Sequence, residues 1–199
     1  MSMERADFSD EARRGDATSR MGMALFLVAL GILFAASLFG YLAIWYRSEA
    51  WGNPVGESLP AALWFSTAVL VACSLAHHRA LTSIRADRGA ALRFWLGITL
   101  GLGALFVVGQ GYAWHRLIEM HLPPQARNLY AFGFYLLTAL HALHVLGGMI
   151  GLGVVWYRAG RKAYTAARHA AVWRSAAYWH FLDAVWIVLF GTLLVTALY

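Results

Sequence analysis

The feature that most constrains this chain is a series of five long apolar stretches that are nearly free of charged residues. They run approximately over residues 21–46, 59–76, 92–114, 129–157 and 175–199. A helix rises about 1.5 Å per residue, so each stretch can cross a hydrocarbon core of about 30 Å. The composition agrees, since 60% of the 199 residues are hydrophobic and 13% are charged, whereas soluble domains are about half apolar and about a quarter charged. The sequence therefore predicts an all-α, polytopic membrane protein, a single bundle of five transmembrane helices over residues 21–199.

The basic residues predict how this bundle is oriented in the membrane. Of the sixteen Lys and Arg residues, four precede the first stretch, and the successive connections hold one, four, two and five when Arg93, at the start of the third stretch, is counted with the connection before it. Alternate segments thus contain thirteen and three basic residues. Because short cytoplasmic loops carry the excess of Lys and Arg, we expect a cytoplasmic N-terminus and a C-terminus outside. Residues 1–20 mix basic and acidic side chains, and we expect them to form a flexible cytoplasmic tail without a cleaved signal.

Other features of the sequence argue against several classes of protein. The single cysteine, Cys73, lies inside an apolar stretch, so neither a disulfide framework nor a thiolate metal site is expected. The net charge of +6 comes from short connections and not from a basic patch interleaved with aromatic residues, so we expect no nucleic-acid partner. The sequence shows no internal repeat and no matched pair of broken apolar stretches, which disfavours a channel or transporter.

The fourth apolar stretch contains His141 and His144, which lie three residues apart and therefore on one helical face. Gly148 and Gly151 continue this face, so another helix can approach it closely and accept hydrogen bonds from the imidazoles. We interpret the face as a buried packing surface. The alternative is ligation of a haem or a metal, because neutral imidazole is a common metal ligand. Two ligands on one face cannot bind opposite sides of one haem, so each would need a partner on another helix.

The fifth apolar stretch contains His180 and Asp183, again three residues apart on one face. An unpaired carboxylate near the middle of the bilayer is unfavourable by about 3 kcal/mol, so Asp183 should face the bundle and be paired. His180 is its nearest candidate partner in the sequence. Gln110 in the third stretch needs a partner on another helix for the same reason. We expect buried polar packing at these positions, with no catalytic, cofactor-binding or metal-binding residue in the chain.

Two segments of the sequence resemble subunit III of the haem–copper respiratory oxidases, the cytochrome c and quinol oxidases. Residues 178–190 read YWHFLDAVWIVLF and are similar to the closing helix of that family. Residues 134–148 read FYLLTALHALHVLGG and resemble its paired-histidine segment, although Ala139 and Ala142 replace the usual glycines. Weaker agreement extends over about residues 21–199. Longer members have seven helices, and this chain resembles the short, five-helix form.

The resemblance implies a function in aerobic electron transport. It implies a non-catalytic subunit of a proton-pumping terminal oxidase in the bacterial plasma membrane, with haem and copper expected in its partner subunits. The expected partners are the catalytic subunit I, subunit II and phospholipid. Arg158 and His169 lie in the connection that resembles the lipid-headgroup region of the family. An anionic lipid is also the ligand that a cationic cluster at a membrane surface would select.

Three positions depart from the family pattern. Leu30 replaces a buried glutamate of the first stretch, Ala113 replaces an acidic residue near the end of the third, and Trp173 replaces a glutamate before the last. Any function that depends on those carboxylates cannot be carried over to this chain.

Several alternatives remain open at this point. Cytochrome c or quinol could be the electron donor, because other subunits bind the donor, and an accessory subunit of a nitric oxide reductase would also fit. From a different class, a haem b membrane anchor passing electrons to quinone could use His141, His144 or His180 as axial ligands. Such an anchor would need histidines at matched depth on facing helices.

Overall fold

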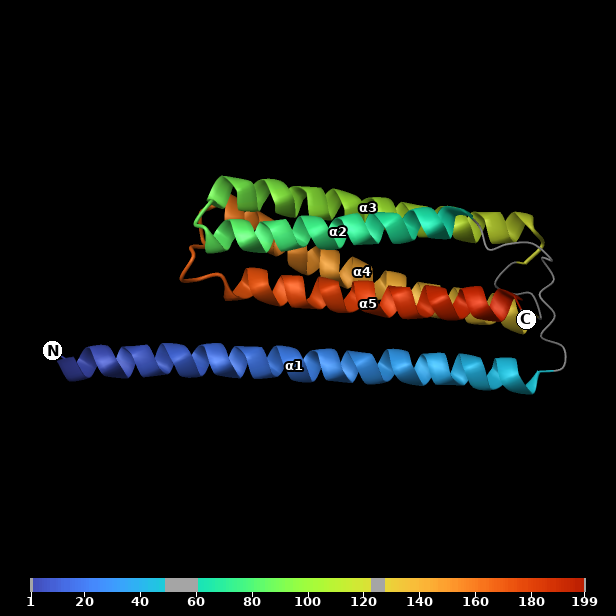
Figure 1. Ribbon diagram of the computed structural model, residues 1–199, viewed down its shortest axis with the longest axis horizontal. Coiled ribbons are helices and arrows are strands. Elements are labelled where there is room, and N and C mark those ends of the chain that lie inside the picture. Colours follow the sequence, from blue (N-terminus) through green and yellow to red (C-terminus); the bar gives the residue numbers. More distant parts are fainter. Residues whose placement is uncertain (1, 49–60, 123–127, 199) are drawn as a thin grey trace.

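The computed structural model describes the backbone of residues 2–48, 61–122 and 128–198, and the side chains of residues 17–48, 63–122 and 128–197. Within these ranges the chain forms five α-helices: α1 (Ser2–Arg47), α2 (Ala61–Arg85), α3 (Gly89–Glu119), α4 (Leu129–Gly160) and α5 (Ala170–Leu198). The helices lie alongside one another in one bundle, and each runs opposite to the next in the sequence (Figure 1). The predicted all-α class is confirmed.

Four of the five helices contain segments long and apolar enough to cross a membrane. These are Ala17–Arg47, Gly89–Glu119, Leu129–Gly160 and Ala170–Ala197. The helix α2 has 25 residues, about 37 Å at 1.5 Å per residue, but its described residues include the polar run of His77, His78 and Arg79. A polytopic membrane bundle is therefore supported, whereas a fifth crossing rests on length alone.

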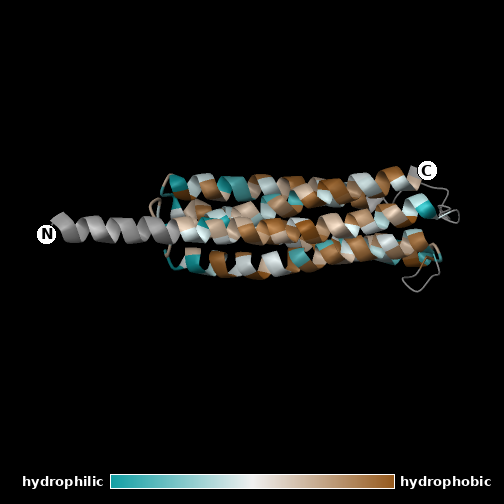
Figure 2. Ribbon diagram, turned by 90° about the horizontal axis from the view of Figure 1, so that it is seen from below, coloured by the Kyte–Doolittle hydropathy of each residue, from teal (hydrophilic) through white to brown (hydrophobic). Residues whose placement is uncertain are grey.

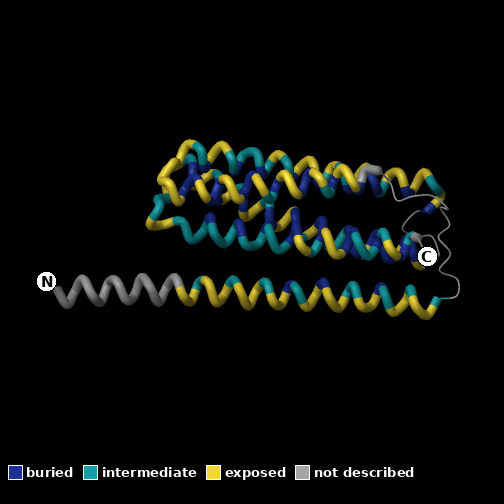
Figure 3. Tube along the Cα trace, viewed as in Figure 1, coloured by how far each residue is buried: buried dark blue, intermediate teal, exposed yellow. Residues whose placement is uncertain are grey.

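The first helix is held to the bundle along one narrow stripe. Leu30, Phe34 and Tyr41 are buried at a spacing that places them on one face, and the Tyr41 hydroxyl lies 2.6 Å from Oγ1 of Thr196 on α5. The rest of the described surface of α1 is largely exposed and apolar (Figure 3). The backbone of α1 begins at Ser2, so it includes most of residues 1–20. The flexibility and cytoplasmic location expected for that segment stay predictions.

The remaining helices form the core. The helix α2 packs against α3 and α5, and α4 packs against α3 and α5, while α1 contacts only α4 and α5 among the described residues. The largest fully buried side chains are aromatic: Trp179, Trp186, Phe106 and Phe134. Glycines let some of these rings approach a neighbouring backbone, since a Cβ placed on Gly103 would lie 3.0 Å from a ring carbon of Trp179. Close packing by small residues is the usual means of helix association in lipid.

Two short connections define what we call the basic end of the bundle, the 86–88 turn and the 161–169 loop. Both lie at the same end, towards the N-terminus of α1 (Figure 1). Asp87 (φ 56°) and Lys162 (φ 54°) adopt left-handed conformations that close α2 and α4, and Oδ1 of Asp87 accepts a hydrogen bond of 3.0 Å from the backbone N–H of Ala166. Hydrophilic residues lie at this end and at the opposite end of the bundle, with mostly hydrophobic residues between them (Figure 2).

Candidate functional site

A cluster of polar side chains lies between α2 and α5. Ser74 Oγ is 2.7 Å from Nδ1 of His180, and the same nitrogen is 3.9 Å from Oδ2 of Asp183, which is 8% exposed. The ring of His77 lies 6.4 Å from that of His180 between centroids. Within the described part of the chain, neither nitrogen of the fully buried His77 has a hydrogen-bond partner. His180 and Asp183 thus lie close together, with two residues of α2 beside them, but neither carboxylate oxygen of Asp183 forms a hydrogen bond with any residue that the structure describes.

The second polar position is His141, which lies at the centre of the bundle among aromatic rings. Its ring centroid is 5.1 Å from that of Trp186 on α5, 5.6 Å from that of Phe106 on α3 and 6.1 Å from that of Phe34 on α1. The imidazole is fully buried, and neither of its nitrogens forms a hydrogen bond with any residue that the structure describes. His141 therefore fills space between four helices.

His144 and Gln110 occupy separate places. Nδ1 of His144 lies 2.7 Å from the carbonyl oxygen of Leu140 on its own helix, and the Tyr178 hydroxyl donates a 2.8 Å hydrogen bond to the backbone carbonyl of His144. Gln110 is 2% exposed, and its amide has no partner among the described side chains and backbone groups. The imidazole of His144 therefore hydrogen-bonds within α4. The hydrogen bond between α4 and α5 at this position uses the backbone carbonyl of His144 and not its side chain.

The buried polar residues thus do not converge on one reactive centre. Among the residues that the structure describes, no group of three or more His, Cys, Asp or Glu side chains could hold a metal ion. Sequence reasoning missed Ser74 and His77. Their spacing of three residues on an apolar helix is the same signal that identified His141 with His144 and His180 with Asp183. The role expected for all of these residues, buried polar packing, stays a prediction.

The residues expected to contact lipid lie at the basic end. Arg158 lines a groove of about 540 Å³ between α1, α4 and α5, together with Arg174, Tyr164 and Phe26. Glycines at positions 147, 148 and 151 line the groove, and their lack of side chains leaves space on this side of α4. An adjoining hollow of about 570 Å³ contains His169 and is likewise lined by Tyr164 and Arg174. Arg158 and His169 therefore line two neighbouring hollows that share a boundary.

Hydrogen bonds and charges order the loop that separates these hollows. Nδ1–H of His169 donates a 2.6 Å hydrogen bond to the carbonyl oxygen of Ala166. Arg174 donates a hydrogen bond to Oγ of Ser19 on α1. Burial raises the pKa of Tyr164, whereas the positive charges of Arg158 and Arg174 act in the opposite direction. The hollows therefore combine a cationic rim with an apolar wall.

The three residues that stand where the family pattern predicts acids pack against the rest of the bundle. Leu30 is 6% exposed and Ala113 is fully buried, so both belong to the hydrophobic core. Trp173 packs under Arg20, whose guanidinium carbon lies 5.6 Å from the centroid of the indole ring. Trp173 lies in the first turn of α5 and makes a cation–π contact there.

Comparison with known proteins identifies the group to which the chain belongs. The sequence model of the family described as cytochrome c oxidase subunit III matches residues 10–197. The chain belongs to the cytochrome c oxidase subunit III family.

Similar proteins agree with this assignment. A cytochrome c oxidase subunit 3 of Synechocystis sp. is 38% identical over 85% of this chain and 72% of its own length. One from Thermostichus vulcanus is 32% identical over 87% of this chain and 85% of its own. A probable cytochrome c oxidase subunit 3 of Nocardia farcinica is 35% identical over 81% of this chain and 80% of its own. The resemblance read from residues 134–148 and 178–190 is confirmed.

Proposed function

We propose that this chain is the non-catalytic subunit III of a proton-pumping haem–copper terminal oxidase, a cytochrome c oxidase of the bacterial plasma membrane. Membership of the subunit III family carries the proposal. The polar groups of the described interior support a structural role, because His141 is enclosed by aromatic rings and His180 is engaged by Ser74. The chain would hold no redox cofactor, and the haem and copper would reside in its partners, subunits I and II.

The proposed topology has five membrane crossings, a cytoplasmic N-terminus and a C-terminus outside. The 86–88 turn and the 161–169 loop lie at one end of the bundle (Figure 1). The described basic residues at or near that end are Arg20, Arg79, Arg85, Arg88, Arg93, Arg158, Arg161, Lys162, Arg168 and Arg174. At the opposite end the described basic residues are Arg47 and Arg116. This asymmetry supports a cytoplasmic location for the basic end.

The proposed lipid is an anionic phospholipid bound by Arg158 and His169. The groove at Arg158 has the form that such a ligand needs, since it combines guanidinium groups at the basic end with an apolar path along α4. A cationic cluster next to an apolar surface attracts an anionic headgroup at the membrane interface. His169 orders the loop between the two hollows and so supports the same site.

Purification of the chain from its native membrane in mild detergent tests the proposed function. We expect subunits I and II to co-purify with it, with the visible spectrum of haem in the complex and no Soret band in the chain after separation. A Soret band that stays with the separated chain would instead support a haem b anchor. Oxidation of quinol, or reduction of nitric oxide, by the purified complex would assign the chain to one of the other oxidoreductases.

A further inference from the structure

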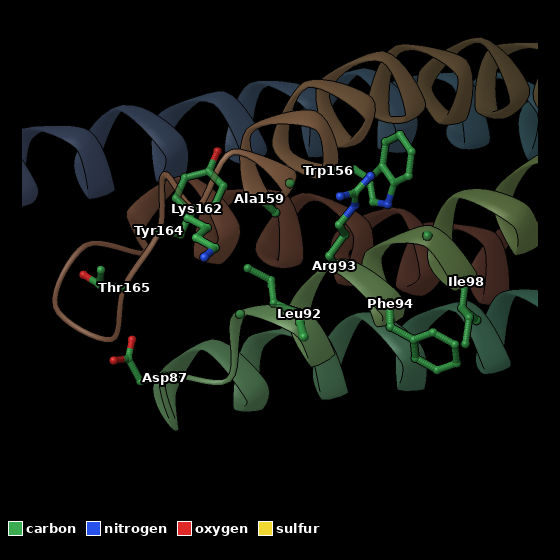
Figure 4. Close-up of a pocket in the computed structure, with 14 residues that line it drawn as sticks. Asp87, Leu92, Arg93, Phe94, Ile98, Trp156, Ala159, Lys162, Tyr164 and Thr165 are labelled. Carbon is green, nitrogen blue, oxygen red and sulfur yellow. The ribbon is translucent and has the colours of Figure 1, made fainter.

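Another groove, bounded by Tyr164 like the two hollows above, lies on a different face of α4 from the groove of Arg158. It has a volume of about 960 Å³ and runs between the start of α3 and the end of α4, with the 161–169 loop at its rim (Figure 4). Gly97 and Gly160 line it, and their missing side chains leave room for Arg93 and Trp156. A Cβ on Gly160 would lie 3.0 Å from Nη1 of Arg93.

Two cations lie at the rim and wall of this groove, Arg93 and Lys162. The guanidinium carbon of Arg93 lies 5.2 Å from the ring centroid of Trp156, which fixes its position. Among the described residues, neither cation takes part in an ion pair. Asp87 also lines the rim, but one of its carboxylate oxygens binds the backbone of Ala166. The groove therefore holds an excess of positive charge.

The rest of the groove is apolar and opens on the outer surface of the bundle. Phe94, which is 62% exposed, and Ile98 line the part that leads away from the basic end along α3. The groove thus has a cationic end and an apolar channel that follows a membrane helix. The cationic end matches the phosphate of an anionic lipid, and the apolar channel matches an acyl chain. A guanidinium and an ammonium are the groups that bind a phosphate best.

We propose that this groove binds one anionic membrane phospholipid, with its phosphate between Arg93 and Lys162 and one acyl chain along Phe94, Ile98 and Gly97. The site differs from the one assigned to Arg158 and His169, because the two grooves use different residues of α4, although Tyr164 lies at the boundary of both. The proposal does not depend on the electron donor of the complex.

The test uses native mass spectrometry of the complex purified in mild detergent and titrated with phosphatidylglycerol or phosphatidylcholine. Each of Arg93→Gln and Lys162→Gln should weaken retention of phosphatidylglycerol about fivefold, the effect of one interfacial charge. Arg79→Gln is the matched control, because Arg79 lies 5.3 Å from the centroid of the Trp95 ring and does not line the groove. Lys162 is exposed on a loop, so its substitution tests the site even if the Arg93 variant assembles poorly.

A photoreactive benzoylphenylalanine in place of Phe94 locates the bound lipid. We expect it to cross-link phosphatidylglycerol, and Lys162→Gln should reduce that product about fivefold. The same group in place of Phe39, which is 73% exposed on α1, should be insensitive to Lys162→Gln. Cross-linking of position 94 to another subunit would overturn the proposal, as would equal retention of the two lipids or equal retention by the variants and the control.

Discussion

Replacing Gly148 with alanine would place a methyl group where the ring of Tyr178 lies. A Cβ at this position would be 2.6 Å from Cε1 and 3.2 Å from Cδ1 of that ring. The ring belongs to α5, and its hydroxyl donates a 2.8 Å hydrogen bond to the carbonyl oxygen of His144 on α4. The substitution therefore acts on the contact that fixes these two helices together.

The expected loss of stability follows from three contributions. Overpacking of a close contact destabilises by about 1–3 kcal/mol, and displacement of the ring would weaken a hydrogen bond worth about 1 kcal/mol. Alanine in place of glycine inside a helix contributes up to about 1 kcal/mol in the opposite direction. We therefore expect Gly148→Ala to destabilise the α4–α5 contact by about 1–3 kcal/mol, the sum of these opposing contributions.

The measurement is the thermal release of the chain from its complex in mild detergent. Gly147→Ala and Gly151→Ala are matched controls on the same helix, since a Cβ at either position meets no atom within 4 Å. Both controls should be neutral or slightly stabilising. A second variant, Tyr178→Leu, should remove most of the difference between Gly148→Ala and the parent, because the clashing ring is gone. If Gly148→Ala behaves like its two controls, the close approach of Tyr178 is not a determinant of assembly.

Three further predictions concern the polar residues. Asp183→Leu should lower the yield of assembled complex more than Asp183→Asn, because leucine removes the polar group that lies 3.9 Å from Nδ1 of His180, and loss of a buried polar partner is unfavourable by about 1–3 kcal/mol; equal yields would contradict the pairing. Replacing Arg158 and His169 together with alanine should reduce the anionic phospholipid seen by native mass spectrometry, and unchanged lipid would show that these two side chains do not hold it. Hydrophobic carbodiimides should label no membrane-span carboxyl other than Asp183, which peptide mapping after labelling tests. Leu30→Glu should not increase proton pumping, which a pumping assay of the variant complex tests.

The sequence was sufficient to predict the helices but not all of their ends. Apolar stretches mark the part of a helix that lies in hydrocarbon, whereas the backbone hydrogen bonds continue into the polar residues that follow. The second stretch was predicted to end near residue 76, yet α2 continues to Arg85 and stops only where Asp87 turns the chain. Its expected start at residues 59–60, and the expected end of the last stretch at residue 199, lie outside the described residues.

The candidate site was predictable to the extent that its residues share a helix. Spacing of three residues predicts that His180 and Asp183 are neighbours, and their side chains lie 3.9 Å apart, because neighbours on one helical face are fixed by the geometry of the helix. Packing between helices decides which residue of a second helix faces a given side chain, and the periodicity of the sequence gives no information on that packing. Ser74 was missed for this reason, and so was the ring of aromatic side chains around His141.

The three-residue turn between α2 and α3 has a consequence for how the chain enters the membrane. A helix that carries His77, His78 and Arg79 has a weak tendency to partition into lipid by itself. The turn at residues 86–88 is too short to let α2 and α3 separate, and α3 is strongly apolar. We expect the translocon to release the two helices together as a hairpin, after α3 has left the ribosome. The helix α2 would then enter the lipid only after α3 has been synthesised, and not as soon as its own synthesis is complete.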